Sequence, residues 1–175
     1  NLAAACGGLV ALAVSFWRFR HANVGWVING ALAGLVGITA SANIVSPAAA
    51  VAIGGIAGLL CVGATILLER LQIDDVVGAV PVHGVCGVWG TLAVALFADV
   101  AVFGTGLSRG GQLLAQLKGI GVCFVWAFGV SYVTLRLVNR WLPLRVTAEA
   151  EHLGLNVSEH GASTEKVPPK SELPN

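Results

Sequence analysis

The stretch DDVVGAVPVHGVCGVWGTLAVALFA, residues 74–98, decides the fold, because a single ionisable side chain, His83, interrupts a long uncharged run. An apolar run of about 20 residues is long enough for a helix to cross the hydrocarbon core of a bilayer. An ionisable group inside such a helix is costly, and it usually faces the interior of a helix bundle or a water-filled cavity. The stretch therefore predicts a membrane helix whose histidine has a structural or functional task.

The composition of the whole chain agrees with a membrane protein. Of its 175 residues, 56% are hydrophobic and 11% are charged, whereas a soluble domain carries about 25% charged residues. The formal net charge is +1, so no basic surface indicates a nucleic-acid partner. The chain begins at Asn1 and contains no methionine, and we expect it to be a piece of a longer protein. The partner that the composition predicts is the lipid bilayer.

Hydropathy predicts an all-α integral membrane fold, a bundle of five transmembrane helices within residues 1–142. The expected spans are residues 2–17, 26–44, 48–68, 76–98 and 112–138. Glycines recur at helical spacing, as in Gly30 and Gly34, and small residues let helix backbones approach closely in lipid. The plainest interpretation of this pattern is a tightly packed bundle, which by itself indicates no transport.

Basic residues predict the orientation. Arg18, Arg20 and Arg70 lie in the first and third connections, while the second has no basic residue and the fourth has only Arg109. Three more arginines lie at or after the end of the last span: Arg136, Arg140 and Arg145. Because cytoplasmic loops carry the excess of Lys and Arg, the first and third connections and the carboxyl end are expected on the cytoplasmic side.

Residues 143–175 form a polar tail after the last span. Acidic residues alternate with alanine, leucine and histidine over residues 145–155, which is compatible with a short helix at the cytoplasmic face. Three prolines lie near the end of the chain, and this composition is typical of a disordered segment. The domain organisation expected is a membrane part followed by a cytoplasmic tail.

His83 is the candidate site residue inside the spans. If the helix begins after Asp75, His83 lies about eight residues in, or ~12 Å along the axis. Helical spacing puts small side chains on the same face: Ala79, Val80, Cys86, Gly87 and Gly90. Either another helix packs closely on this face, or a narrow passage runs beside the ring. The candidate pore or substrate-binding residues are His83, Val80 and Gly87.

Two features lie before His83. Asp74 and Asp75 can cap the helix, because a carboxylate accepts from free backbone N–H groups and faces the positive end of the helix dipole; the alternative is a pore mouth. Pro81 is expected to bend the helix and to free a carbonyl near Val77, which must then find another partner.

Three stretches, in this order along the chain, resemble the ammonium transporter family (Amt/Mep, and distantly Rh): residues 30–59, 74–98 and 126–161. The resemblance implies eleven spans, an external amino end, a cytoplasmic carboxyl end and a homotrimer in the cell membrane (inner or plasma membrane) with one pore per subunit. The five predicted spans are similar to the last five of that arrangement.

The resemblance also implies a function. In this family two histidines from different spans share a hydrogen bond in a hydrophobic pore and guide ammonium, or ammonia and a proton, across the membrane. His83 matches the second histidine; the first belongs to an earlier span that this chain lacks, so the pore would be incomplete here. No cofactor or metal is implied. The pattern departs from the family at Gly78, where many members have an acidic residue, and at Pro81.

The tail of the family packs on cytoplasmic loops and responds to a PII-type nitrogen regulatory protein. The candidate regulatory residues carried over are Arg145, Glu149, Gly154, Asn156, His160 and Gly161. Asn156 stands where aspartate is usual and Ala162 where glutamate often follows, so structural packing of the tail remains an alternative to partner binding.

Two other function classes compete with transport. A membrane sensor or receptor of the same fold would bind ammonium and signal through its tail, but the residues after Leu142 are too few for an ordinary signalling domain. An intramembrane enzyme would need a nucleophile with a base, or axial ligands, within the spans. His83 is the one histidine inside the predicted spans, so an enzyme is not expected.

Overall fold

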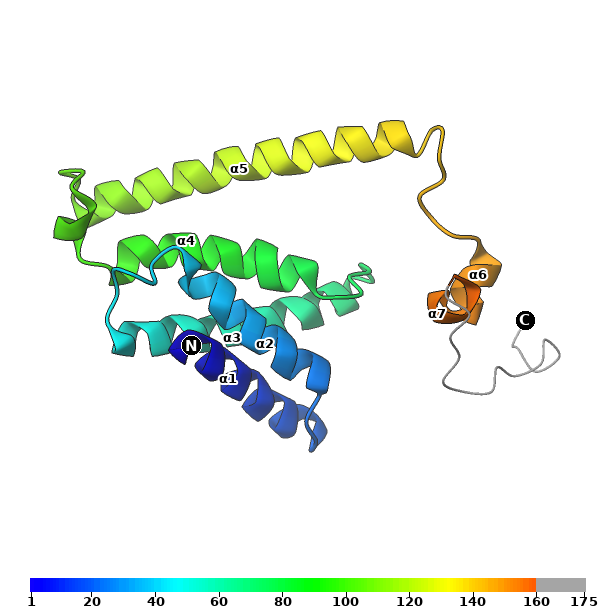
Figure 1. Ribbon diagram of the computed structural model, residues 1–175, viewed down its shortest axis with the longest axis horizontal. Coiled ribbons are helices and arrows are strands. Elements are labelled where there is room, and N and C mark those ends of the chain that lie inside the picture. The colour runs from blue at the N-terminus through cyan, green and yellow to red at the C-terminus, as the bar shows by residue number, and fades with distance from the viewer. Residues whose placement is uncertain (160–175) are drawn as a thin grey trace. The chain divides into compact units, whose positions relative to one another are not determined.

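The computed structural model describes residues 1–159, and every regular element in this range is a helix. The chain divides into two compact units, Asn1–Cys123 and Phe124–Asn175. Figure 1 shows the helices in chain order. The first unit contains α1 (Leu2–Phe19), α2 (Val24–Thr39), α3 (Pro47–Arg70), the π-helix η1 (Val80–Val85), α4 (Cys86–Phe97), the short 3₁₀ helix η2 (Val100–Phe103) and the first turns of α5.

Polar side chains fix where the helices begin. The Asn23 side chain accepts a hydrogen bond from the Trp26 N–H (3.1 Å), and Ser46 Oγ accepts one from the Ala49 N–H (3.2 Å). Pro47 follows Ser46 in the first turn of α3, where its missing N–H costs nothing. These caps satisfy backbone donors that a helix start leaves free.

The first unit is held together by close approach of backbones, as the glycine spacing predicts. A Cβ added to Gly34 of α2 or to Gly54 of α3 would overlap the carbonyl oxygen of Ala3 in α1. A Cβ on Gly90 of α4 would come within 2.7 Å of the Gly37 carbonyl oxygen in α2. Helices α1, α2 and α3 therefore cross at distances that leave no room for side chains at these points.

Small apolar side chains fill the core between α2, α3 and the η1–α4 helix. The buried cluster consists of Ala33, Ala57, Cys61, Val82 and Cys86, with Val36 and Trp89 packed against it. The Trp89 indole N–H donates to the Ile53 carbonyl (3.0 Å), so this ring packs in the core and has its polar group satisfied there. Of the remaining cysteines, Cys6 is half-buried and Cys123 is exposed within the described residues.

Within residues 1–159, four helices are long and apolar enough to cross a membrane, namely α1, α3, the continuous η1–α4 helix and α5 (Arg109–Val138). Helix α2 has 16 residues and ends at Thr39, so the expected span of residues 26–44 is wrong at its end. The Ser41 and Ile44 N–H groups bond to the Ile38 and Ser41 carbonyls (both 3.0 Å), which makes this segment a turn. The number of five spans stays a prediction.

The described part of the second unit, residues 124–159, contains the later turns of α5 and two short helices, α6 (Ala148–Leu153) and α7 (Leu155–Ser158). Thr147 caps α6 by accepting from the Ala150 N–H (3.2 Å), and this confirms the short helix expected within residues 145–155. The segment predicted to be disordered falls in residues 160–175, which lie outside the described part of the chain.

Candidate functional site

Asp75 organises the start of the helix that carries His83. Its two carboxylate oxygens accept hydrogen bonds from the backbone N–H groups of Ala79 and Val80, each at 2.8 Å. Both donors belong to the first turn, where a helix has no backbone partner for them. Asp75 thus caps the helix, and its negative charge faces the positive end of the helix dipole.

Asp74 does not take part in this cap. Its side chain is exposed, and it lines a small hollow of about 170 Å³ together with Asp75 and Glu69. Thr65, Leu68, Ile73, Gly78 and Pro81 complete the walls of this hollow. Three carboxylates therefore share one opening beside the start of the His83 helix.

The helix begins later than the sequence predicts. Residues 74–78 are turn and coil, Gly78 has a positive φ of 76°, and the π-helix begins at Val80. Because only glycine adopts such a φ without strain, Gly78 separates the Asp75 turn from the helix. His83 therefore lies in the first turn of its helix, and not about eight residues into it as the sequence predicts.

Pro81 also has a different position from the one expected. It lies in the first turn of η1 and is buried, so its missing N–H is harmless there. The carbonyl of Val77, four residues before, receives its hydrogen bond from the side-chain amide of Asn29 on α2 (Nδ2 to O, 3.1 Å). The freed carbonyl that the sequence predicts is real, and its partner comes from another helix.

The turn that holds His83 is a π-helix. The Cys86 N–H donates to the carbonyls of His83 and Pro81, and the bond to Pro81 reaches back five residues, as a π turn requires. Such turns are rare, widen the helix locally and occur frequently at functional sites. The extra residue in the turn changes which side chains lie on the same face as His83.

The face around His83 is open within the first unit. His83, Val80 and Gly84 are exposed, and a Cβ added to Gly87 would meet no atom within 4 Å. Among residues 1–159, no hydrogen bond joins the His83 ring to another group. The structure thus leaves His83 and Val80 exposed and Gly87 half-buried with open space beside it. We call the surface formed by these three residues the His83 face.

Two residues assigned to this surface from spacing lie elsewhere. Cys86 is 0% exposed and donates through Sγ to the Ala57 carbonyl of α3 (3.3 Å). Gly90 packs against Gly37 of α2. Both point into the bundle because the π turn rotates the residues after it relative to an ideal α-helix. The expectation that they share a face with His83 is therefore wrong.

The tail residues form a separate group in the second unit. Arg145 forms an exposed ion pair with Glu151 of α6, Glu149 lies in the first turn of α6, and Gly154 joins α6 to α7 with a φ of 88°. Asn156 belongs to α7. His160 and Gly161 lie outside the described residues.

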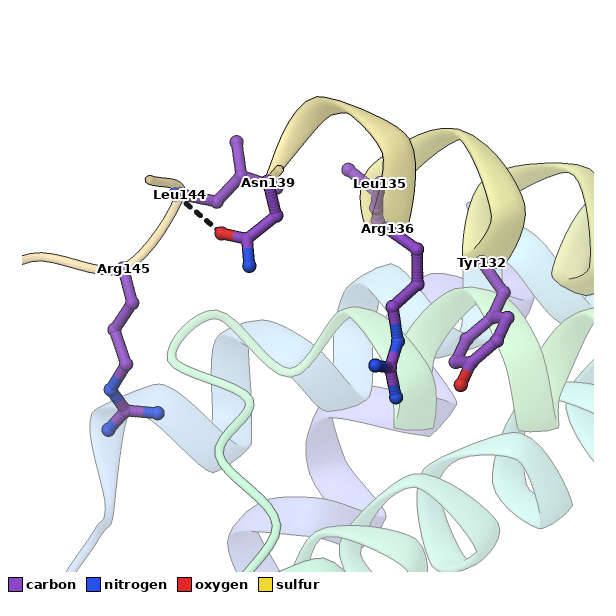
Figure 2. Close-up of a pocket in the computed structure, with 6 residues that line it drawn as sticks. All are labelled: Tyr132, Leu135, Arg136, Asn139, Leu144 and Arg145. Carbon is purple, nitrogen blue, oxygen red and sulfur yellow. Dashed lines mark hydrogen bonds between the residues drawn. The ribbon is translucent and has the colours of Figure 1, made fainter. Parts of the chain in front are cut away.

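Figure 2 shows a hollow between the end of α5 and the segment that follows it. It has a volume of about 390 Å³ and is lined by Tyr132, Leu135, Arg136, Asn139, Leu144 and Arg145. Asn139 Oδ1 accepts from the Leu144 N–H (2.9 Å) and so holds the chain where it turns away from α5. The Arg136 guanidinium lies over the Tyr132 ring, 5.1 Å from its centroid.

Sequence reasoning did not find the roles of Asn29 and Arg109. The Arg109 guanidinium donates to three carbonyls at the end of α4, those of Ala95 (2.7 Å), Leu96 (2.7 Å) and Ala98 (3.1 Å). A cation at a helix C-terminus is favourable on electrostatic grounds as well. The single arginine in the fourth connection therefore has a structural explanation.

We expect Asp75→Ala in the complete protein to lower its stability by about 1–2 kcal/mol, because both first-turn donors lose their acceptor. Asp74→Ala is the matched control and should change stability by no more than about 0.5 kcal/mol. Thermal unfolding in detergent measures both. Equal effects of the two substitutions would contradict the cap.

Comparison with known proteins places the chain in a family. Residues 1–165 match the family described as Ammonium Transporter Family. A Synechocystis protein named for ammonium transport is 49% identical over 166 residues, which cover 94% of this chain and 30% of the relative. Ammonium transporter Amt2 of Archaeoglobus fulgidus is 42% identical over 173 residues, covering 93% of this chain and 37% of the relative. The chain thus spans roughly a third of the length of these relatives.

Solved structures agree with the sequence relatives. A structure titled Sensor Amt Protein superposes with a TM-score of 0.83 at 44% identity, covering 91% of this chain and 40% of that one. Saccharomyces cerevisiae Mep2 gives a TM-score of 0.73 at 32% identity, covering 88% and 39%. With a family match over nearly its whole length, an all-helical fold and apolar membrane-length helices, the chain is a membrane protein that belongs to the ammonium transporter family.

Proposed function

We propose that this chain is the carboxyl-terminal part of a protein that moves ammonium or ammonia across a membrane, and that the His83 face is one wall of its passage. The observation that carries the proposal is a histidine ring on an exposed surface of small and apolar residues in a member of this family. Upstream spans would supply the opposite wall. Residues 1–142 would then form the last five of eleven spans, and residues 143–175 a cytoplasmic tail.

Physical chemistry explains why such a passage would use histidine. Moving a bare cation into a medium of low dielectric constant costs tens of kcal/mol in the idealised limit. The protein must therefore replace the water around the ion or remove a proton from it. A neutral imidazole offers one donor and one acceptor, and it exchanges a proton near neutral pH. Apolar walls beside such a ring favour a small hydrogen-bond donor such as ammonia over hydrated sodium or potassium.

The finer features of the proposal follow the family. We propose a homotrimer in the inner or plasma membrane with its carboxyl end in the cytoplasm, an orientation supported by the arginines at the ends of α1 and α3 and after α5. The tail, with its Arg145–Glu151 ion pair, is the proposed contact for a PII-type regulatory protein.

The experiment compares methylammonium uptake by the complete protein with that of its His83→Ala variant, in cells that lack their own ammonium uptake. Uptake should fall by at least about tenfold, because a hydrogen bond to a charged group contributes about 1.5–3 kcal/mol and each ~1.4 kcal/mol is a factor of about ten. His21→Ala is the matched control, because His21 is an exposed histidine of the first connection. Unchanged uptake and selectivity in His83→Ala would overturn the proposal.

A second candidate function is sensing. Similarity to the structure titled Sensor Amt Protein favours it. A sensor would bind ammonium at the same face and signal through the tail while moving little substrate. Measurable binding of ammonium without uptake, in the same cells, would support this second function over transport.

A further inference from the structure

Asn29 connects α2 to the segment that leads into the His83 helix. Its side-chain amide donates to the Val77 carbonyl across 48 positions of sequence, at 3.1 Å. The neighbouring residue Gly78 lies so close that a Cβ there would overlap Asn29 Nδ2. The backbone carbonyl of Asn29 also accepts from Cys61 Sγ of α3 (3.7 Å). Asn29 is therefore fixed in the bundle and reaches the lead-in segment, residues 75–80, from one side.

Asp75 holds the same segment from within, through its bonds to the Ala79 and Val80 N–H groups. Pro81 and Val82, directly after the segment, are buried. The backbone on the amino-terminal side of His83 is thus held at Val77, at Ala79 and Val80, and at Pro81 and Val82.

The His83 ring has no such support of its own. It is exposed, and among the described residues 1–159 no hydrogen bond holds it. Its position relative to the other helices is therefore decided by the backbone of the π turn, and that backbone is joined to α2 through Val77. Hydrogen bonds require donor–acceptor distances of about 2.7–3.2 Å, and a misplacement of ~1 Å in a reacting geometry can cost about a hundredfold.

We propose that Asn29 is a positioning residue for His83: its amide, acting through the Val77 carbonyl, sets the place of the imidazole in the passage. The proposal rests on the proposed function and names a residue for it that touches neither the ring nor the substrate. Gly78 contributes to the same arrangement. Its missing side chain and its left-handed φ of 76° allow the Asn29 side-chain amide to reach the Val77 carbonyl.

The test uses Asn29→Leu in the complete protein, which keeps the approximate volume of the side chain, removes the donor and adds no titratable group. Methylammonium uptake should fall by about three- to tenfold, the effect of losing one hydrogen bond. The shape of the pH profile of uptake should change as well, because a merely destabilised protein loses uptake equally at every pH whereas a misplaced imidazole does not. Asn29→Gln, which keeps the amide donor, should recover part of the activity. Asn43→Leu, at an exposed asparagine of the turn after α2, is the matched control.

Gly78→Ala should break the same hydrogen bond, because the added methyl group would overlap the Asn29 side-chain amide. We expect it to reproduce both the lower uptake and the altered pH profile. The double variant should be no worse than the more severe single variant, since both remove one interaction. Additive losses, or a lower uptake with an unchanged pH profile, would contradict the positioning role. If His83→Ala alters uptake but Asn29→Leu and Gly78→Ala do not, the inference about Asn29 fails while the proposed function stands. If His83→Ala has no effect, the proposed function itself fails.

Discussion

Replacing Gly54 by alanine is expected to lower the stability of the complete protein by about 3 kcal/mol, the upper end of the usual cost of overpacking. The added methyl group would overlap the Ala3 carbonyl carbon and oxygen. Backbone atoms cannot rotate away as a flexible side chain can, so α1 and α3 must separate. Gly34 of α2 meets the same Ala3 carbonyl, and a movement of α1 would therefore loosen its contact with α2 as well.

The matched control is Gly8→Ala, a buried glycine of α1. Its added Cβ would meet the Ala31 Cβ at 3.4 Å, an ordinary van der Waals distance, and alanine has the better helix propensity by about 1 kcal/mol. We expect this variant to be neutral or slightly more stable. Thermal unfolding in detergent compares the pair, and equal melting temperatures for the two variants would contradict the close α1–α3 crossing.

Replacing Arg109 by alanine is expected to cost about 2–3 kcal/mol. The substitution leaves the carbonyls of Ala95, Leu96 and Ala98 without their cationic donor, and a hydrogen bond to a charged group contributes about 1.5–3 kcal/mol. We expect a total loss of stability close to the contribution of one such bond. Arg109 is exposed, so water can hydrogen-bond to the carbonyls that lose the guanidinium. The end of α4 and the connection to α5 should become more mobile.

Arg109→Lys separates the charge from the shape of the guanidinium. Lysine keeps the favourable cation at the helix C-terminus but cannot present the planar fork that reaches several carbonyls. We expect about half of the loss seen with alanine. Hydrogen exchange of the amides at the end of α4 measures the local effect, and a rate that is unchanged in Arg109→Ala would show that the guanidinium does not hold this end.

The sequence predicts most of the fold because long apolar runs leave few alternatives. Hydropathy alone locates the central parts of the helices, and Ser46 followed by Pro47 marks the start of α3. The sequence does not predict the end of α2, because the residues after Thr39 stay mostly small or apolar while the backbone turns. Pro81 is itself a signal for the late start of the η1–α4 helix, since proline is favoured in the first turn of a helix. Pro81 predicts a kink only if the helix begins directly after Asp75, and in the structure the helix begins after Gly78.

The candidate site is predicted less completely. His83 and Val80 are exposed and Gly87 has open space beside it, and their role as pore or substrate-binding residues stays a prediction. Cys86 and Gly90 were misplaced because periodicity assumes an α-helix, and the π turn changes the register. No local pattern can predict that Asn29 binds the Val77 carbonyl, since the two residues lie on different elements and their contact depends on how the helices pack.

The most direct test of the central claim is an experimental structure of the complete protein that shows the surroundings of His83. The account predicts an enclosed passage beside the ring, with Val80 and Gly87 on the same wall and a second polar side chain within hydrogen-bonding reach of the imidazole. A ring that faces lipid, or one covered by packed side chains with no adjoining cavity, would contradict it.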